Sequence, residues 1–285
     1  MNVGIVSVDS KIPNLALMRL SAWHKAQGDT VEVAWPLMAD TYDRVYRSKQ
    51  FDFTPDDPIA WPCEVIEGGT GYKTDARLTQ EQDTTYPDYV LFDCDYALGR
   101  ITRGCIRRCD WCCVWRDDGK VHQVAELPDF WRGQGRLRLL DDNLTAMPDL
   151  FIKTCKQLSA ARVAVCFESL DVRLMTVEMA ATLKTVKRWK QVHFAWDNPA
   201  HESEIVRGIE NLKAGGFPLW AATFYVLIGY NTTPEEDMHR IKTLHKLGVE
   251  VFVMPYDKRD TYQRRLARWC NHKAIFKTVE WEVYR

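Results

Sequence analysis

The stretch from Cys105 to Cys113, with the sequence CIRRCDWCC, is the most informative part of this 285-residue chain. Cys105, Cys109 and Cys112 have C-x3-C-x2-C spacing, so one short loop can direct three thiolates at a single iron–sulfur cluster. Such clusters usually have four cysteine ligands, and three cysteines therefore leave one iron without a protein ligand. An open coordination position is where the chemistry of a bound metal takes place. The spacing thus predicts a catalytic iron–sulfur centre.

A zinc site or unrelated thiols are the alternatives for these cysteines. Zinc knuckles usually contain two close ligand pairs, and the chain has no second C-x2-C pair and no His-x3-His pair. With nine cysteines, a chance triple at this spacing is expected in about one in a hundred chains. Cys155 and Cys166 lie in apolar segments and are expected to be buried. The remaining cysteines form no second tight triple, so no further cluster is expected; they are Cys63, Cys94, Cys113, Cys155, Cys166 and Cys270.

The composition is that of an ordinary globular protein. Apolar residues make up 46% and charged residues 27% of the chain, and the length allows one or two domains. The net charge of −1 gives no overall positive field that would attract nucleic acid. The chain has no apolar run of about 18 residues and no signal-peptide pattern, so no membrane segment is expected. Nine cysteines without a secretion signal indicate a reducing compartment, and the cytoplasm is the expected location.

Residues 1–88 are expected to form a small, Rossmann-like parallel α/β domain. A strand at 3–8 precedes a helix that begins at Pro13 and ends near Gln27. Further strands are predicted at 30–34, 44–48 and 63–66. Strand, helix and strand in this order favour a parallel sheet. The irregular polar and proline-containing segments that follow place the domain boundary near Asp88.

Residues 89–285 show repeated strand-then-helix patterns, which is the layout of a partial (β/α)6 barrel with a C-terminal extension. The first strand, at 96–102, delivers the cysteine loop at its carboxyl end, where parallel barrels place their chemistry. Later strands are predicted at 136–140, 163–167, 191–195, 222–228 and 249–254. Helices are predicted between them at 148–158, 176–186, 202–214 and 234–247. Thr233 and Glu236 form a capping box at the start of the last of these helices.

The cysteine loop resembles that of the radical S-adenosylmethionine (SAM) enzymes. In that family three cysteines at this spacing hold a 4Fe-4S cluster, and an aromatic residue usually precedes the third cysteine, as Trp111 does here. The resemblance implies that the fourth iron binds the amino and carboxylate groups of SAM, with Trp111 close to the cofactor. One electron, from a flavodoxin- or ferredoxin-type donor, then cleaves SAM to methionine and a 5'-deoxyadenosyl radical. That radical abstracts hydrogen from a substrate, so the chain is expected to be an enzyme.

The same resemblance implies SAM contacts at the carboxyl ends of the later strands. Asp141, Asp142 and Asn143 occupy the region that contacts the SAM amino group, although helix capping would explain the same residue types. Glu168 and Arg173 resemble the residues that hold the SAM ribose and carboxylate. The planar guanidinium fork of arginine suits a carboxylate, and a salt bridge within the protein is the alternative.

Three further residues are candidates for the site. Asp197 would face the ribose or the substrate, with a structural cap as the alternative. Gly229 follows a predicted strand and would allow the backbone to approach the adenine closely. Cys270 lies beyond the last strand, where its thiol could donate a hydrogen atom to a substrate radical.

The N-terminal part resembles, loosely, the Rossmann-like cobalamin-binding domain that precedes many radical SAM barrels. The turn 68–71, with the sequence GGTG, occupies the place of the glycine loop that cradles a nucleotide in that domain. The Asp-x-His-x-x-Gly motif, whose histidine binds cobalt in many members, is absent. His24 is the only histidine before residue 100, and it lies inside a predicted helix. Cobalamin is therefore not expected, and a cobalamin-dependent methyltransferase is an alternative.

The resemblance extends over most of the chain to phage- and mobile-element-associated radical SAM proteins, and it does not define a substrate. Nucleotides, nucleic acids and peptides all stay open. A basic group could contact phosphate while nearby aromatic side chains stack on bases, or it could be a solvated helix face. Its members are Lys258, Arg259, Arg264, Arg265 and Arg268, with Tyr256, Tyr262 and Trp269 beside them. A metal-bearing nucleic-acid-binding module without catalysis is the alternative from a different functional class.

Overall fold

The computed structural model describes residues 1–284, which divide into two compact units. The first unit comprises Met1–Gly99 and Ala125–Gln134, and the second comprises Arg100–Val124 and the described residues from Gly135 onward. The first unit thus extends past the expected boundary at Asp88. Two contacts inside it explain why: the Tyr89 hydroxyl donates to the Phe130 carbonyl, and Gly99 lies against the Phe130 ring, where a Cβ would be 2.1 Å from a ring carbon.

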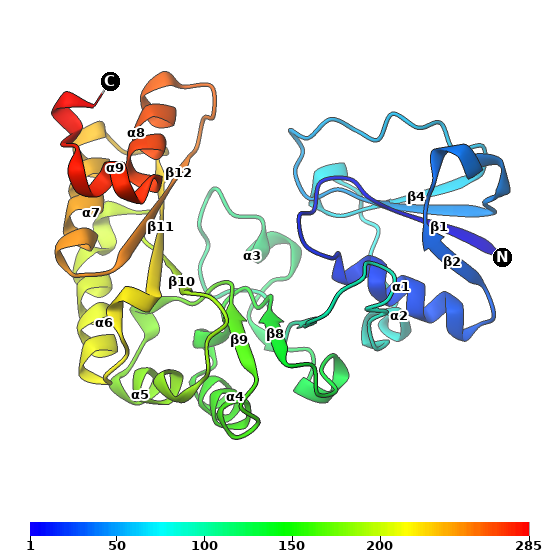
Figure 1. The fold of residues 1–285 in the computed structure, drawn as a ribbon, viewed down its shortest axis with the longest axis horizontal. Coiled ribbons are helices and arrows are strands. Elements are labelled where there is room, and N and C mark those ends of the chain that lie inside the picture. The colour runs from blue at the N-terminus through cyan, green and yellow to red at the C-terminus, as the bar shows by residue number, and fades with distance from the viewer. Residues whose placement is uncertain (285) are drawn as a thin grey trace. The chain divides into compact units, whose positions relative to one another are not determined.

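A four-stranded parallel sheet with strand order β2-β1-β3-β4 forms the centre of the first unit (Figure 1). Helix α1, Leu15–Ala26, lies along one face of the sheet, and Asn14 caps its first turn. The shared core consists of Val3, Ile5, Leu17, Leu20, Val31 and Tyr46. The strands are β1 Asn2–Ser7, β2 Thr30–Val33, β3 Arg44–Ser48 and β4 Glu64–Gly68. The predicted parallel α/β architecture of this part is confirmed, and this order of strands is consistent with a Rossmann-like domain.

Several short elements lie between or after the strands of this sheet and complete the first unit. The polar segment before Asp88, expected to be irregular, contains one short helix, which a capping box between Thr79 and Gln82 stabilises. These elements are η1 Pro36–Thr41, η2 Thr70–Tyr72, α2 Gln80–Thr84, β5 Ala97–Gly99 and η3 Leu127–Asp129.

Two groups of parallel strands form the centre of the second unit. Strands β8, Arg136–Leu139, and β9, Ala164–Phe167, pair in parallel. A second sheet has the order β10-β11-β12, with β10 Val192–Ala195, β11 Ala222–Ile228 and β12 Glu250–Pro255. Because β9 and β10 belong to separate hydrogen-bonded sheets in the described chain, the continuous (β/α)6 barrel stays a prediction.

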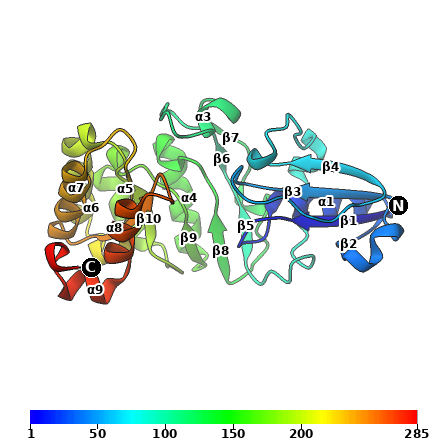
Figure 2. The same cartoon turned by 90° about the horizontal axis from the view of Figure 1, so that it is seen from above.

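Helices follow the strands of the second unit on one side, as Figures 1 and 2 show. Apolar residues on that side of the strands, such as Phe167, Phe194 and Phe224, are almost fully buried. The helices are α4 Pro148–Ala160, α5 Val177–Thr185, α6 Glu202–Ala214 and α7 Pro234–Lys246. The predicted capping box of Thr233 and Glu236 at the start of α7 is confirmed.

The strand expected at 96–102 is interrupted before it reaches the cysteine loop. Only β6, Thr102–Arg103, directly precedes the loop, and it pairs antiparallel with β7, His122–Gln123. This pairing closes the base of the loop. Gly104 has a φ of +82° there, and a Cβ on it would lie 2.6 Å from the Lys120 carbonyl oxygen, so only glycine fits.

Further short elements complete the second unit. They are α3 Val114–Asp117, η4 Leu144–Ala146, η5 Val172–Leu174, η6 Pro199–His201, η7 Leu219–Ala221, α8 Thr261–Asn271, α9 Lys273–Thr278 and η8 Trp281–Val283. Over residues 1–284, no helix combines the length and the apolar composition that crossing a bilayer requires.

Candidate metal and cofactor site

The residues that follow β8 hold the start of the cysteine loop. The Asp141 carboxylate accepts hydrogen bonds at Oδ1 from the backbone N–H groups of Ile101, at 3.0 Å, and Thr102, at 2.6 Å. The Asp142 carboxylate accepts from the Gly104 N–H at 3.0 Å. Burial raises the pKa of Asp141 to about 6, against the opposing effect of these hydrogen bonds. Both carboxylates therefore position the loop backbone.

Asn143 continues this pattern and reaches the first cysteine. Its side-chain Nδ2 donates to Cys105 Sγ at 3.3 Å, and the Arg107 backbone N–H lies 3.4 Å from the same sulfur. The Thr145 hydroxyl donates to Asn143 Oδ1 at 2.8 Å and fixes the orientation of the amide. N–H donors directed at a cysteine sulfur are a feature of iron–sulfur sites, where they tune the cluster potential.

Cys105, Cys109 and Cys112 are all half-buried, whereas Cys113 is exposed. Burial raises the pKa of the Cys109 and Cys112 thiols. Thiolates are soft ligands that select iron–sulfur clusters or zinc, and metal binding releases their protons. One loop with three partly accessible thiols, one of them accepting N–H bonds, fits a cluster that lacks a fourth protein ligand.

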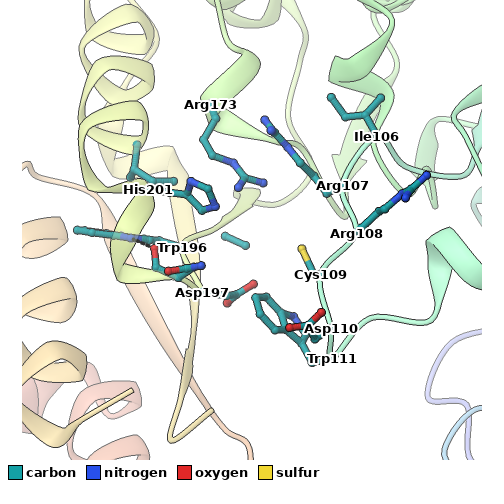
Figure 3. Close-up of a pocket in the computed structure, with 13 residues that line it drawn as sticks. Ile106, Arg107, Arg108, Cys109, Asp110, Trp111, Arg173, Trp196, Asp197 and His201 are labelled. Carbon is teal, nitrogen blue, oxygen red and sulfur yellow. Dashed lines mark hydrogen bonds between the residues drawn. The ribbon is translucent and has the colours of Figure 1, made fainter. Parts of the chain in front are cut away.

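A cavity of about 470 Å³ opens beside the loop (Figure 3), and its volume lies in the usual range for small-molecule sites. Figure 3 shows Arg107, Cys109 and Arg173 on one side, with Trp111 and Asp197 across from them. Cavity walls come from the cysteine loop, η5, the segment after β10 and α6. The lining residues are 106–111, Arg173, 195–198, His201 and Ile205.

Asp171 links two cationic side chains at this cavity. It accepts from Arg107 Nε at 2.8 Å and from Arg173 Nε at 2.7 Å. Burial alone would raise the pKa of Asp171, but the two guanidinium groups hold it below its usual range. The salt-bridge alternative for Arg173 is therefore present in the structure. One carboxylate and two guanidinium groups leave a net positive charge beside Cys109.

Asp197 forms the opposite wall of the cavity, at the carboxyl end of β10. Its Oδ1 accepts from the Leu227 N–H at 3.0 Å, and burial raises its pKa. Arg240, which is fully buried, donates to the carbonyl oxygens of Trp196 and Leu227 and holds the two strand ends together. The sequence alone did not identify Asn198 and His201 as cavity residues, because both lie on a turn whose path depends on this packing.

Of the predicted site residues, Cys109, Trp111, Arg173 and Asp197 line the cavity, whereas Cys105, Cys112, residues 141–143, Glu168, Gly229 and Cys270 do not. The Glu168 carboxylate accepts from Arg138 and from the Cys166 thiol. Gly229 has a φ of +74°, and a Cβ there would lie 2.2 Å from the Gln263 amide nitrogen, so the fold itself requires glycine. The 2% exposed Cys270 lies in α8, and burial raises its pKa to about 12. Because Cys270 is buried in α8 and does not line the cavity, the structure does not support a direct role for its thiol there.

Comparisons with known proteins bear on the fold of the chain. No model of a known protein family matches the chain, and no curated protein matches it. Among solved structures, it is similar to TsrM from Kitasatospora setae, a radical S-adenosylmethionine methyltransferase with cobalamin and a [4Fe-4S] cluster bound. The two chains are 13% identical with a TM-score of 0.61, over 89% of this chain and 74% of that chain.

This comparison bears on the expectation about cobalamin. Because the structural neighbour has cobalamin bound, the expectation that this chain lacks cobalamin gains no support. At 13% identity, the likeness concerns the fold alone. The chain thus has a mixed α/β fold with parallel sheets that is similar to the fold of this neighbour.

Proposed function

We propose that the chain is a radical SAM enzyme whose site is the cavity beside the cysteine loop. The main support is the way Asp142 and Asn143 hold Gly104 and Cys105 in a loop that carries three thiols, one of which, Cys109, lines a cavity of about 470 Å³. With a 4Fe-4S cluster and SAM bound, one electron from a flavodoxin- or ferredoxin-type donor would give methionine and a 5'-deoxyadenosyl radical that takes hydrogen from a substrate.

The chain's own residues have distinct roles in this proposal. Cys105, Cys109 and Cys112 would hold the cluster. Arg173, oriented by Asp171, would bind the SAM carboxylate, because a guanidinium still offers free N–H donors after one bidentate contact. On the other side of the cavity, Asp197 and Trp111 would contact the rest of the cofactor. In this arrangement the side chains of Asp141, Asp142 and Asn143 hold the cysteine loop and do not contact SAM.

Anaerobic reconstitution with iron and sulfide tests this proposal. The natural chain should develop the broad visible absorption of an iron–sulfur cluster and should form 5'-deoxyadenosine from SAM and dithionite. Cys112→Ala should abolish both signals. Cys113→Ala is the matched control, since Cys113 is adjacent but exposed, and it should retain both. A natural chain that forms no cluster, or a Cys112→Ala chain with full activity, would exclude the proposal.

Cobalamin-dependent methyl transfer is the second candidate, favoured by the cobalamin of the structural neighbour. The first unit contains one histidine, His24, whose Nδ1 lies 2.6 Å from Asp29 Oδ2 and whose Nε2 lies 3.0 Å from the Tyr46 hydroxyl. Both ring nitrogens are thus engaged, as expected of a structural residue. Cobalamin in this unit would have to bind without an imidazole ligand.

Corrinoid binding distinguishes the two candidates. The chain should be mixed with hydroxocobalamin, separated by gel filtration and examined by visible absorption. Co-elution of a corrinoid at one equivalent, together with transfer of labelled methyl from SAM to a product, would establish the second candidate. A chain that excludes corrinoid but still forms 5'-deoxyadenosine would leave the first.

A further inference from the structure

A second group of polar side chains lies on the face of β8, β9 and β10 opposite the helices. Arg138 and Cys166 are cross-strand partners in the β8–β9 register, so they share this face. Glu168 lies two residues beyond Cys166, and His193 projects from β10 toward it. A polar group in a strand interior needs partners, since burying an unpaired polar atom is costly. Unlike the cysteine loop, this group combines three different ligand types.

The geometry of the group suits a single metal ion. One ligand atom from each of Cys166, Glu168 and His193 lies within 4.8 Å of the others. Cys166 Sγ is 3.0 Å from Glu168 Oε1, and His193 Nδ1 is 3.8 Å from Glu168 Oε2. Tetrahedral zinc, with bonds of about 2.0–2.3 Å, places its ligands roughly 3.5 Å apart. The observed spacings bracket that value, so small side-chain rotations would complete the site.

His193 provides an independent sign of a missing partner. Its Nδ1 is buried and, within residues 1–284, forms no hydrogen bond. Arg138 bonds Glu168 at Oε1 and leaves Oε2 directed at the imidazole. A ligating carboxylate fixed in this way by an outer hydrogen bond is typical of metal sites.

We propose that Cys166, Glu168 and His193 bind a zinc ion, with Arg138 as the residue that positions the carboxylate. A thiolate, an imidazole and a carboxylate are the ligands zinc prefers, and three protein ligands leave a fourth coordination position for water or a substrate atom. This site goes beyond the proposed SAM cavity and gives Glu168 a role other than a SAM contact. Binding releases the Cys166 proton, so zinc replaces one proton at the thiol.

The fourth coordination position of this zinc would face the cavity, where a substrate would bind. Ala195 lies two residues after His193 on the same face of β10, about 7 Å along the strand, and it lines the cavity. Tyr225 in β11 is the register partner of Ala195, and the centroid of the Tyr225 ring lies 5.1 Å from that of the His193 ring. The zinc would therefore lie next to the cavity wall, where it could hold a donor atom of a substrate that extends past the cofactor.

Cobalt substitution tests the site without SAM. Because the loop cysteines also bind metal, the full-length background variant carries Cys105→Ala, Cys109→Ala and Cys112→Ala. After chelation, it should bind one equivalent of Co²⁺ with a thiolate-to-cobalt charge-transfer band and intense tetrahedral visible bands. Adding Cys166→Ser should remove the charge-transfer band. Adding His193→Gln should weaken Co²⁺ binding by about 10-fold or more, since even outer partners of metal ligands have effects of this size.

Cys155→Ser is the matched control in the same background. Cys155, in α4, is as fully buried as Cys166, but burial alone raises its pKa, whereas the Glu168 carboxylate also raises that of Cys166. This variant should bind cobalt unchanged. A background variant that binds no cobalt, or a Cys166→Ser chain with an unaltered band, overturns the zinc site and leaves only the ion pair of Glu168 with Arg138.

A second measurement covers the case in which the background variant misfolds, as judged by circular dichroism. The natural chain with its cluster reconstituted should contain one zinc per chain by elemental analysis, and the Cys166→Ser chain should contain none. Equal zinc in both chains, or zinc in neither, overturns the site. Formation of 5'-deoxyadenosine reports separately on the proposed radical SAM function, so the two proposals can fail independently.

Discussion

Asn143 Nδ2 lies 3.3 Å from Cys105 Sγ and connects the end of β8 to the first cysteine of the loop. An N–H donor stabilises extra negative charge on a cluster sulfur and so raises the reduction potential. Asn143→Ala should therefore shift the cluster midpoint potential to a more negative value and slow reductive SAM cleavage by about 10-fold. A redox titration followed by electron paramagnetic resonance measures the first effect, and 5'-deoxyadenosine formation measures the second.

Asn211→Ala is the control for this variant, because the Asn211 amide donates to the Met175 carbonyl elsewhere in the same unit. It should leave the potential unchanged even if it lowers stability. An Asn143→Ala chain with the natural potential would show that the amide does not act on the cluster sulfur.

Arg173 should determine SAM affinity if the cavity is the SAM site. Hydrogen bonds to a charged partner contribute about 2 kcal/mol, so Arg173→Gln should raise the Kd for SAM roughly 30-fold. The measurement is equilibrium dialysis with the cluster-loaded chain. Arg264→Gln removes an exposed guanidinium on α8 and should leave the Kd unchanged. An unchanged Kd for Arg173→Gln would place SAM elsewhere.

The strands were predictable because their burial follows a simple sequence pattern. The bounds of β11 agree with the prediction at 222–228, and those of β9 and β10 agree within one residue. β9 and β11 are largely apolar runs that end at a polar residue or a glycine, which is typical of a buried parallel strand, and β10 carries one polar residue, His193. The strand expected at 96–102 is the exception, because the Asp141 carboxylate takes up the N–H groups of Ile101 and Thr102 that a strand would use for pairing.

The site was predictable only where its residues are close in sequence. The loop cysteines follow one local spacing. In contrast, the ion pair of Asp171 with Arg107 and the packing of Gln263 against Gly229 join segments that are distant in sequence. The proximity of Cys166 and His193 likewise depends on how β9 and β10 are placed. No local pattern encodes such pairs, because they arise from tertiary packing.

Asp141 should make the stability of the apo chain depend on pH. Its pKa of about 6 is above the ordinary 3.8, so folding disfavours the ionised form. Its contribution to stability is fully present below about pH 4 and is lost as the pH rises through about 6. Asp141→Asn keeps the Oδ1 acceptor but cannot ionise. The free energy of unfolding of the natural chain should therefore fall, relative to Asp141→Asn, by about 2 kcal/mol between pH 4 and pH 7.

Urea unfolding at several pH values measures this difference. The exposed Asp40→Asn chain is the control and should follow the natural chain across the range. Parallel pH profiles for the natural and Asp141→Asn chains would mean that Asp141 is not held in a desolvated environment.

Gly69 should be required for the turn after β4 by packing as well as by backbone conformation. It has a φ of +91°, and a Cβ there would lie 2.4 Å from the Lys49 carbonyl oxygen. Gly133, in the same unit, has a φ of +97° with no atom within 4 Å of the same position, so it isolates the conformational part. Gly133→Ala should cost about 1–2 kcal/mol of unfolding free energy, and Gly69→Ala should cost clearly more, since backbone atoms must also move. Urea unfolding of both variants measures the difference. Equal losses of unfolding free energy would mean that Gly69 is required only for its backbone conformation.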